Sequence, residues 1–503
     1  MPAASDVFLT CYFLVLGVLC VYGLHRYSLV WLYYRHRSRE PRLTSCFREL
    51  PTVTVQLPMY NEPAVARRII EAAAALDYPR DRLEIQVLDD STDDTVRIVT
   101  ETVERLRQRG VDAVYLHRDD RTGFKAGALA EGLRLAKGQF LCVFDADFVP
   151  VPGTLRELIH YFADPEVGLV QARWVHLNRS ESLLTKAQAV LLDGHFVIEH
   201  AARNRSGRFM SFNGTAGMWR RECIEDAGGW QHDTLTEDLD LSYRAQLKGW
   251  KFVYLPDVVA PAELPPEMRA FKVQQHRWTK GGAQTLRKLL PAIMRSRLPL
   301  RIKVEAFFHL TSCIVYLFMV ALTMMIMPAV MLRHQLFESE PVASAVVAVG
   351  IMVLACFSAA TFYTASQLAI LNSWWNSIKY IPFLMCLGIG ISLNNARATL
   401  SGFFSDTGTF ERTPKYADAE PTRCARRSRA QGRRMAGRVD GQTCLELVLG
   451  FGFLLGILLC AADREVAGCI PFLALFMIGY LYVGGCSLTG RRVAAPRPAS
   501  APA

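Results

Sequence analysis

The chain has 503 residues, of which 51% are hydrophobic and 21% are charged, and its mean hydropathy is positive at +0.15. This composition excludes a disordered or collagen-like chain and favours a polypeptide in which membrane and water-soluble segments alternate. Lys and Arg outnumber Asp and Glu by 57 to 47, which leaves nucleic acid, anionic lipid and phosphorylated substrates as candidate partners. The 13 cysteines form no CxxC pair and no Cys/His ladder, which argues against a zinc site and against a disulfide scaffold.

The first predicted element is a membrane helix. From Val7 to Leu24 the chain carries no formal charge, enough for roughly 27 Å of helix. A cleaved signal peptide is the alternative, but no basic residue precedes this run and no small-residue cleavage pattern closes it, so we favour a retained helix. Several arginines follow it, at Arg35, Arg37, Arg39 and Arg42. The positive-inside rule therefore places the next segment in the cytoplasm and the N-terminus outside.

Residues from about 50 to 300 alternate short apolar runs of β type with helical stretches, which is typical of an α/β domain. Three of the predicted strands end in acidic residues, in the segments Val53–Glu62, Glu84–Asp90 and Gln139–Asp147. Ligands of parallel α/β sheets bind outside the carboxyl ends of the strands, so these acidic ends should meet in one crevice. Asp145 and Asp147 suit a Mg²⁺ or Mn²⁺ ion that bridges two phosphates, although aspartates also end many strands without binding a metal.

Further polar motifs follow in the same predicted domain. Lys125 stands beside glycines at a predicted helix start, which suits a diphosphate, with a solvated lysine as the alternative. Phe212–Gly217 is a glycine-containing turn. Thr236, Glu237 and Asp238 open a helical run, and ordinary helix capping by Thr236 is also compatible with this pattern. Gln274–Trp278 then brings a cation and a large aromatic ring to the end of the domain.

Apolar stretches return after the predicted α/β domain. They are Ala306–Leu332, Ala345–Leu371, Ile381–Leu393, Leu445–Ala461 and Cys469–Val483. The loop that includes Arg423–Arg438 holds seven arginines and no acidic residue there, so it should be cytoplasmic. Three spans between the cytoplasmic α/β domain and this loop would put the two on opposite sides of the membrane. We therefore expect Ile381–Leu393, the shortest stretch, to be an interfacial or re-entrant helix rather than a span. The predicted topology has five spans, with the C-terminus inside.

Taken together, the motifs resemble a processive family 2 glycosyltransferase of the cellulose synthase superfamily. The resemblance rests on Asp89/Asp90, Asp145/Asp147, Thr236–Asp238 and Gln274–Trp278, in this order and followed by membrane helices. The wording of Gln56–Glu62, Val87–Thr92 and Lys248–Tyr254 is most similar to the cellulose synthase-like A and C branch of mannan, glucomannan and xyloglucan-backbone synthases. It extends from about Pro51 to Lys415.

The resemblance implies a GT-A (Rossmann-like) α/β catalytic domain, located in the cytoplasm and inserted between transmembrane α-helices. The implied reaction is an inverting transfer from a nucleotide sugar, GDP-mannose and/or UDP-glucose, to the growing end of a β-linked mannan, glucomannan or β-glucan that the protein also exports. Mg²⁺ or Mn²⁺ would be the cofactor. Membrane lipids would be partners and nucleic acid would not. The implied location is a plasma or inner membrane, or an endomembrane.

Site residues follow from the resemblance by position in this sequence. Asp238 would be the base, and Asp145 with Asp147 would hold the metal. The nucleotide would be bound by Tyr60, Glu62, Asp90, Lys125 and Arg277. The acceptor would be bound by Phe212, Asn213, Gly214, Thr215, Glu237, Gln274 and Trp278. Phe410, Thr413 and Lys415 look like a gating loop, although Arg412 and Pro414 depart from the usual wording.

The expected division of the chain has six parts. Residues 1–45 form the first span and a basic linker, 46–300 the glycosyltransferase domain with interfacial helices, and 301–403 transmembrane and interfacial helices. Residues 404–441 hold the candidate gating loop and the arginine-rich loop, 442–488 two further spans, and 489–503 a disordered tail.

Two other functions remain open, and the sequence leaves the oligomeric state undetermined. A single sugar transfer to a lipid acceptor would use the same acidic pattern, and the length of the product would separate it from polymer synthesis. A transporter or channel with a non-catalytic nucleotide-binding domain is disfavoured because ionisable groups are sparse within the predicted spans.

Overall fold

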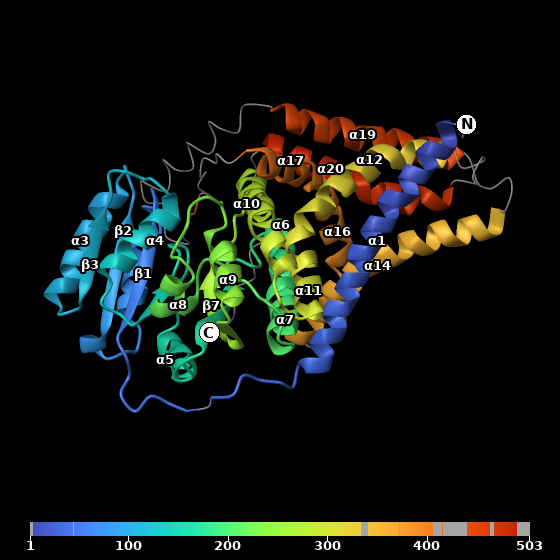
Figure 1. Cartoon of the computed structure of the whole chain (residues 1–503). Coiled ribbons are helices and arrows are strands. Elements are labelled where there is room, and N and C mark those ends of the chain that lie inside the picture. The colour runs from blue at the N-terminus through green and yellow to red at the C-terminus, as the bar shows by residue number, and fades with distance from the viewer. Residues whose placement is uncertain are drawn as a thin grey trace.

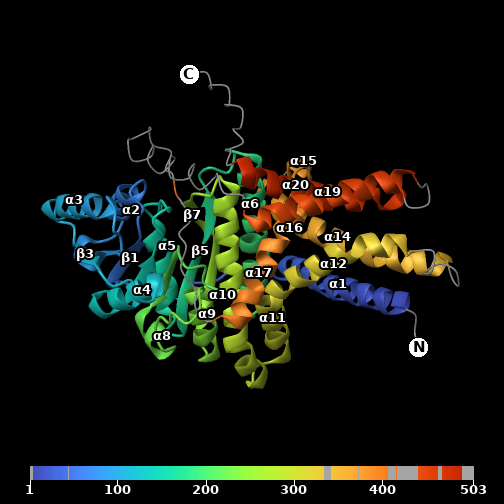
Figure 2. The same cartoon turned by 90° about the horizontal axis from the view of Figure 1, so that it is seen from above.

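The computed structural model describes residues 4–43, 45–332, 341–371, 373–405, 415, 440–462 and 467–489. Figure 1 shows a half that contains the strands and a bundle of long helices that extends away from it. Figure 2, seen at 90° to this view, shows the same long helices projecting from one side of the strand-containing half. The described chain therefore separates into a sheet domain and a helical bundle.

A seven-stranded mixed sheet forms the centre of the sheet domain. In spatial order its strands are β3 (Ala113–His117), β2 (Leu83–Asp89), β1 (Val53–Met59), β4 (Phe140–Val143), β6 (Gly217–Arg220), β5 (Val167–His176) and β7 (Lys251–Ala262). β6 runs antiparallel to both of its neighbours, and all the other pairs are parallel. Polar side chains inside the sheet pair across strands, as where Thr54 donates to Glu84 over 2.7 Å. The parallel order brings the acidic ends of β1, β2 and β4 to one edge, as predicted.

Helices cover both faces of this sheet. They are α2 (Ala66–Ala74), α3 (Thr95–Gln108), α4 (Phe124–Leu135), α5 (Thr154–Ile159), α8 (Arg221–Asp226) and α9 (Glu237–Leu247), with the short turns η1 (Arg80–Arg82) and η2 (His160–Ala163). On one face α2, α3 and α5 bury Ile70, Val99 and Leu158. On the other face α4, α8 and α9 pack around Leu129 and Trp219. Because both faces are covered, the carboxyl ends of the strands remain as the edge where α/β domains bind ligands.

A layer of helices lies between the sheet and the long helices (Figure 1). It contains α6 (Leu183–Asp193), the π-helix η3 (Gly194–His200), α7 (Ala201–Arg205), α10 (Met268–Arg295) and α11 (Leu300–Leu310). In two stretches of this layer, Ser182–Ala202 and Met268–Leu290, apolar residues at helical spacing are mixed with charges. The interfacial position expected for helices of the glycosyltransferase domain stays a prediction.

The bundle contains the remaining helices. They are α1 (Ala4–His36), η4 (Thr311–Ile314), α12 (Val315–Met331), α14 (Pro341–Leu371), α15 (Trp374–Ile378), α16 (Ile381–Gly390), α17 (Ser392–Phe404), α19 (Gly441–Ala462), η5 (Ala467–Cys469) and α20 (Ile470–Thr489). Within the described residues, four helices are long and apolar enough to cross a membrane: Ala4–His36, Leu300–Met331, Gly441–Ala462 and Ala467–Leu488. These four helices indicate an integral membrane protein and contain four of the predicted spans almost entirely.

The two remaining apolar stretches behave differently. Ala345–Leu371 lies in the 31-residue helix α14, which is not one of those four. The stretch Ile381–Leu393 is not a straight span, because the axis bends by 45° between α16 and α17. A bent pair of this kind is either a broken span or a re-entrant segment, and the second of these agrees with the prediction.

Several predicted features lie outside the described residues. These are the gating-loop candidates Phe410 and Thr413, the arginine-rich segment Arg423–Arg438 and the tail after residue 489. Lys415, the third gating-loop candidate, is described. The proposed division into six parts remains a prediction.

Candidate active site

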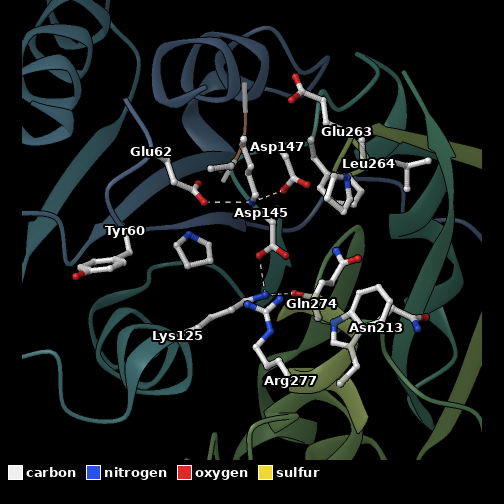
Figure 3. A pocket seen from close by; sticks show the side chains of 18 of the residues that line it. Tyr60, Glu62, Lys125, Asp145, Asp147, Asn213, Glu263, Leu264, Gln274 and Arg277 are labelled. Atoms are coloured by element: carbon white, nitrogen blue, oxygen red, sulfur yellow. Dashed lines mark hydrogen bonds and ion pairs between the residues drawn. The ribbon is translucent and has the colours of Figure 1, made fainter. Parts of the chain in front are cut away.

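A cleft of about 280 Å³ opens at the edge of the sheet where the acidic strand ends meet. It is lined by the predicted site residues Tyr60, Glu62, Asp90, Lys125, Asp145, Asp147, Asn213, Gly214, Glu237, Asp238, Gln274, Arg277, Trp278 and Lys415. In Figure 3, Lys125 and Arg277 point toward Asp145 from one side, with Glu62 and Asp147 on the other. Residues that are up to 350 positions apart in the chain, Glu62 and Lys415 among them, therefore share one cavity.

The segment after β4 presents Asp145 and Asp147 to this cleft. Phe144 and Ala146 are 0% and 1% exposed, whereas Asp145 and Asp147, in the turn that follows β4, line the cleft. The backbone N–H of Asp145 donates to the hydroxyl oxygen of Thr215 over 2.9 Å. This hydrogen bond fixes the Asp145 backbone to the loop that precedes β6.

Lys125 lies in the first turn of α4, after Gly123 in a left-handed conformation with φ of +74°. Its Nζ donates to Asp145 Oδ1 over 2.6 Å and to the carbonyl oxygen of Gly214 over 2.7 Å. Burial by itself would lower the pKa of Lys125, but Asp145 and Glu237 outweigh burial and the pKa is raised. Lys125 therefore keeps the positive charge that a diphosphate partner requires.

Lys415 brings a second cation to the cleft from the far end of the chain. Its Nζ lies 2.6 Å from Asp147 Oδ1 and 3.2 Å from Glu62 Oε1. Burial opposes its charge, yet Asp147 and then Glu62 raise its pKa above the usual value. Asp147 and Glu62 are thus bridged by one ammonium group.

The pair Asp145 and Asp147 can be tested as a metal site. Among the described residues there is no group of three or more His, Cys, Asp and Glu side chains placed to hold a metal ion. Mg²⁺, however, is commonly held by one or two carboxylates together with substrate phosphates and water. In this structure a lysine Nζ lies 2.6 Å from each carboxylate, Lys125 beside Asp145 and Lys415 beside Asp147. The two residues therefore fit a Mg²⁺ or Mn²⁺ ion that binds together with a diphosphate.

Asp238 occupies the first turn of α9 on the same cleft. Its Oδ1 accepts from the backbone N–H of Leu239 over 2.7 Å. Burial, and then the neighbouring charge of Glu237, raise the pKa of Asp238 to about 7. A Cβ at Gly214, where φ is +78°, would lie 3.0 Å from Asp238 Oδ2, so a glycine here lets the loop approach the carboxylate. A carboxylate with a pKa near neutrality is suited to accept a proton during catalysis.

The N-terminus of α9 is held by α10 rather than by a side-chain cap. Thr236 makes no capping hydrogen bond to α9, and its hydroxyl instead lies 3.1 Å from the hydroxyl of Thr285. A Cβ at Gly281 would lie only 2.6 Å from Thr236 Cγ2 and 2.8 Å from Thr236 N. The structure therefore does not show the alternative of ordinary capping by Thr236, because a tertiary contact takes its hydroxyl.

α10 also carries Gln274, Arg277 and Trp278, which lie on one side of the helix at spacings of three and four residues. Burial lowers the pKa of Arg277, and the carboxylates of the cleft, Asp145 first, oppose this effect. Arginine keeps its charge in proteins, so Arg277 adds a fixed positive charge beside Lys125.

The nucleoside end of the predicted site contains two cations that the motif analysis did not name. Arg118 donates to both carboxylate oxygens of Asp90, over 2.8 and 2.6 Å. The guanidinium carbon of Arg121 lies 3.3 Å from the centre of the Tyr60 ring, a cation–π contact. Asp90, predicted to bind the nucleoside, therefore faces the cleft as an ion pair with Arg118.

The four acceptor-loop residues have different places. Asn213 and Gly214 line the cleft, and Asn213 Nδ2 lies 2.9 Å from His195 Nε2 while its Oδ1 contacts His200. Phe212 is 1% exposed and packs edge-on against Trp219, although it also reaches a second cavity. Thr215 is fully buried and lines neither cavity, so the structure makes it a support for Asp145 rather than an acceptor contact.

The second cavity has a volume of about 630 Å³. It shares with the cleft the lining residues Trp174, Leu192, Asn213, Thr236, Asp238, Gln274 and Trp278. Its other walls come from the membrane helices, for example Leu19 of α1, Met319 of α12, Phe362 of α14, Leu387 of α16 and Phe476 of α20. The predicted base and the aromatic ring of Trp278 thus stand between the cleft and a cavity in the helical bundle.

Comparisons with known proteins agree with this geometry. A family model described as "Glycosyltransferase like family 2" matches residues 51–281. Glucomannan 4-beta-mannosyltransferase 7 from Arabidopsis thaliana is 33% identical over 405 residues, which cover 78% of this chain and 69% of that protein. The chain belongs to glycosyltransferase family 2. The resemblance to the cellulose synthase-like branch is confirmed with it.

Other relatives of this family 2 glycosyltransferase match over a shorter length. Glucomannan 4-beta-mannosyltransferase 2 from Arabidopsis thaliana is 46% identical over 252 residues, 49% of this chain and 47% of that protein. Glucomannan 4-beta-mannosyltransferase 1 from Oryza sativa subsp. japonica is 45% identical over 264 residues, 51% of this chain and 50% of that protein. The match with these two relatives spans about half of their length.

A solved structure supports the fold. A mannosyltransferase from Pyrobaculum calidifontis, in complex with GDP-Man and Mn²⁺, superposes with a TM-score of 0.51 at 22% identity, over 72% of this chain and 99% of that one. The predicted GT-A fold is confirmed.

The motif analysis of this glycosyltransferase missed several residues of the cleft wall, among them Trp174, His176, Glu263 and Arg121. Trp174 and His176 lie at the end of β5, and Glu263 directly follows β7. The rule that found the acidic strand ends could have found them, because these are also strand ends of the same sheet. The ends of β5 and β7 lack the paired aspartates by which the other strand ends were found.

Proposed function

We propose that the chain is a membrane-integrated, inverting, processive glycosyltransferase that builds a β-linked mannan or glucomannan from GDP-mannose, with UDP-glucose as a possible second donor. The names of its relatives support the product and the type of bond. The observation that carries the proposal is the common wall of the two cavities, where Asp238, Gln274 and Trp278 face both the nucleotide cleft and the helical bundle.

The proposed mechanism needs one base. Asp238 accepts the proton of the acceptor hydroxyl while the hydroxyl oxygen bonds to the anomeric carbon and the bond from that carbon to the diphosphate oxygen breaks. Attack from the face opposite the leaving group inverts the anomeric configuration. A glycosidase needs a second carboxyl group to protonate its leaving group. Here the diphosphate leaves as an anion between Lys125 and Arg277, so a second acid is unnecessary.

Asp145 and Asp147 would hold a Mg²⁺ or Mn²⁺ ion. When bound, this ion supplies positive charge that stabilises the departing diphosphate. Tyr60, Glu62 and the Asp90–Arg118 pair would bind the nucleoside end. Asn213, Gly214, Glu237, Gln274 and Trp278 would bind the acceptor, with the indole ring against its terminal sugar, and Lys415 would act as part of the gating loop.

The second cavity would receive the growing chain. The hydroxyl groups of a polysaccharide lose their hydrogen bonds to water in hydrocarbon, which is costly unless protein replaces them. A cavity that begins at Trp278 and is walled by α1, α12 and α14 offers such a route. Synthesis and export would then be coupled.

The sheet domain would face the cytoplasm of a plasma membrane or endomembrane. In Figure 1 the N-terminus lies at the end of α1 that is far from the sheet. Arg35 and His36 stand in the last turn of α1, at its other end. The positive-inside rule assigns this end, and with it the sheet domain, to the cytoplasm.

The test uses the detergent-purified full chain with each nucleotide sugar and Mg²⁺ or Mn²⁺. We expect GDP-mannose to give a polymer that β-mannan-specific hydrolases digest. The Asp238→Asn variant should lose at least about 100-fold in rate and still bind the nucleotide, because only the base is removed.

Three results would contradict parts of this proposal. Polymer formation by Asp238→Asn at a rate near the parent's would exclude Asp238 as the base. A product with one sugar on a lipid would favour the lipid-acceptor alternative. No transfer from any nucleotide sugar would exclude a glycosyltransferase activity for this chain.

A further inference from the structure

His176 stands on the wall of the cleft, at the last position of β5. Its backbone partner in β7 is Ala262, and Ala262 in turn forms a bridge with Phe148. Phe148 directly follows Asp147 in the chain. His176 and Phe148, the residue after Asp147, are therefore both backbone partners of Ala262, and His176 lines the cleft together with Asp147 and Glu263.

Both ring nitrogens of His176 are buried and neither has a hydrogen-bond partner among the described residues. The indole Nε1 of Trp174, two residues earlier on the same strand, is in the same situation. The next polar side chain, Asn178, is fully engaged, because it donates to the carbonyl oxygen of Leu264 over 2.9 Å and accepts from Leu264 N over 2.8 Å. Buried polar groups almost always have partners, so two unpaired groups beside the catalytic aspartates point to a ligand.

The charge state of His176 restricts the ligand. Burial lowers the pKa of His176 to about 4, and this outweighs the opposite effect of Asp193. At neutral pH the ring is uncharged, so one nitrogen donates and the other accepts. Such a ring has little attraction for phosphate, which has Lys125 and Arg277 elsewhere in the cleft. One donor and one acceptor on a rigid ring, with the indole N–H nearby, match neighbouring hydroxyl groups of a hexose.

The other parts of the nucleotide sugar already have positions. The nucleoside end belongs to Tyr60 and Asp90, and the diphosphate belongs to Lys125, Arg277 and the metal pair. The acceptor belongs to Trp278, on α10. The donor sugar is then the part of the substrate without an assigned polar contact. His176 lies on a different wall of the cleft, at the end of β5, and is available for it.

We propose that His176 hydrogen-bonds the hydroxyl groups of the donor sugar and takes part in selecting the hexose. The proposal rests on the proposed glycosyltransferase function and adds to it a residue that reads the sugar rather than the nucleotide. Trp174 contributes its indole N–H to the same contact.

The experiment compares the parent with His176→Phe, which keeps a flat ring of similar size without its nitrogens. We measure kcat/KM for the nucleotide sugar that the parent prefers and, separately, the dissociation constant of the matching nucleoside diphosphate. Losing two hydrogen bonds to hydroxyl groups should lower kcat/KM about 10- to 100-fold. The dissociation constant of the nucleoside diphosphate should change by less than about twofold, because this molecule lacks the sugar. The ratio of kcat/KM between GDP-mannose and GDP-glucose, two donors that differ only in the hexose, should move toward one.

A matched control is His36→Phe. His36 is also partly buried with an unpaired Nδ1 among the described residues, but it ends α1 and does not line the cleft. We expect this control to keep the parent's kcat/KM. His176→Gln, which restores one donor and one acceptor, should recover part of the lost kcat/KM, and it decides the test if His176→Phe does not bind nucleoside diphosphate.

The proposal is overturned by a folded His176 variant whose kcat/KM and donor ratio stay within about threefold of the parent's, which is less than one lost hydrogen bond usually costs at a specific site. It is also overturned by a parallel loss of affinity for sugar and for nucleoside diphosphate. If the parent itself transfers no sugar, the proposed function fails first and the role of His176 fails with it. If the parent is active and the His176 variants keep its kcat/KM and donor ratio, the proposed function stands and only the role of His176 is wrong.

Discussion

Pairing between charges sets the reactivity of the residues in the cleft. Lys125 lies 2.6 Å from Asp145 and 3.9 Å from Glu237, and Lys415 lies 2.6 Å from Asp147. These contacts favour the charged form of the two lysines, whose pKa values are raised. Asp238 has a pKa raised to about 7, because it is buried and stands next to Glu237, and burial also raises the pKa of Glu237. Asp238 can therefore exchange a proton near neutral pH.

This pKa predicts the pH dependence of sugar transfer. The base must be ionised, and the pKa of Asp238 in the folded protein lies above its usual value. Activity should therefore be present above about pH 7 and be lost as the pH falls through that value. In the Glu237→Gln variant one of the causes of the raised pKa is absent, so the acidic limb of the kcat/KM profile should move to lower pH. Profiles measured at saturating Mg²⁺ or Mn²⁺ for parent and variant check this.

Glu131→Gln is a suitable control for the pH profile, because Glu131 pairs with Arg134 on the surface of α4 over 3.2 Å. It removes a carboxylate without changing the surroundings of Asp238. An acidic limb that stays at the same pH in Glu237→Gln would contradict the coupling of these two carboxylates. A profile without an acidic limb in the parent would contradict Asp238 as the group that titrates.

At the scale of single residues, the sequence predicted well where one physical rule applied repeatedly. Asp90, Asp145 and Asp147 all end parallel strands, and parallel strand ends must meet at one edge. His176 also ends a strand, but its importance depends on what its ring nitrogens contact, which the sequence does not contain. Thr236 could have capped α9 by its sequence pattern alone, but its hydroxyl contacts Thr285, a residue 49 positions away.

At the scale of elements, the close packing of α10 on α9 positions the proposed base against Arg277 and Trp278. Gly281 makes this packing possible, because an added Cβ would lie 2.6 Å from Thr236 Cγ2 and 2.8 Å from its backbone N. Backbone atoms cannot move aside as the end of a flexible side chain can. The separation of the two helices is therefore part of the active-site geometry.

We predict that Gly281→Ala lowers kcat for sugar transfer. Displacing α10 by a fraction of an ångström moves Trp278 and Arg277 relative to Asp238, and misplacement by about 1 Å costs on the order of 100-fold. Gly452→Ala on α19 is the control, because nothing lies within 4 Å of its added Cβ, it lines neither cavity and both changes favour the helix by a similar amount. Equal rates in the two variants, measured with saturating nucleotide sugar, would contradict this function of Gly281.

A buried chain of charges joins the acceptor loop to the first membrane helix. Asn213 contacts His195, His195 Nδ1 lies 2.9 Å from Glu199, and Arg203 lies 3.3 Å from Glu199 and 3.0 Å from Glu305. Glu305 on α11 reaches His25 of α1 at 3.1 Å. These contacts connect η3 to α7, α7 to α11, and α11 to α1. This chain fixes the sheet domain to the bundle.

We predict that Glu305→Ala destabilises the protein. Arg203 is 2% exposed, and removing one partner of a buried ion pair typically lowers the free energy of unfolding by about 3–5 kcal/mol. The apparent melting temperature in detergent should fall clearly. Glu131→Ala, which breaks the exposed pair with Arg134, should change it little. A melting temperature that falls equally in both variants would show that the buried pair has no special effect.

Elements were predicted with uneven success, for physical reasons. The membrane helices and α10 follow from long apolar or amphipathic patterns, and α1 was found within its observed bounds. The π-helix at Gly194–His200 was not predicted, because its residues have the same composition and nearly the same period as the α-helices on either side. The 45° bend between α16 and α17 was foreseen only as a departure from a straight span, from the short length of the stretch.

At the scale of the whole molecule, the two cavities meet at one wall. The cleft at the sheet edge collects the charges that a nucleotide sugar needs, and the larger cavity is lined mainly by apolar side chains with a few charged ones, such as Arg26 and Glu199. Asp238, Gln274 and Trp278 belong to both. The residues proposed for the reaction come from the sheet domain and α10, and the path proposed for the polymer lies in the bundle, so the proposed function needs both. The cleft was predicted from the acidic strand ends, whereas the larger cavity was not, because it is lined by residues from many separate helices.

Narrowing the larger cavity should therefore shorten the product without stopping the first transfers. Ala359 of α14 lines this cavity, and Ala359→Trp would fill part of its roughly 630 Å³ with an indole ring. If the polymer enters this cavity, the variant should still release nucleoside diphosphate at first, then stall, and its products should be shorter on a sizing column. Gly350→Trp is the matched control, because Gly350 is on the same helix, is exposed and has nothing within 4 Å of an added Cβ. Products of parental length from Ala359→Trp would mean that the chain leaves by another route. Products of a single sugar from the parent itself would instead make the cavity a site for a lipid acceptor.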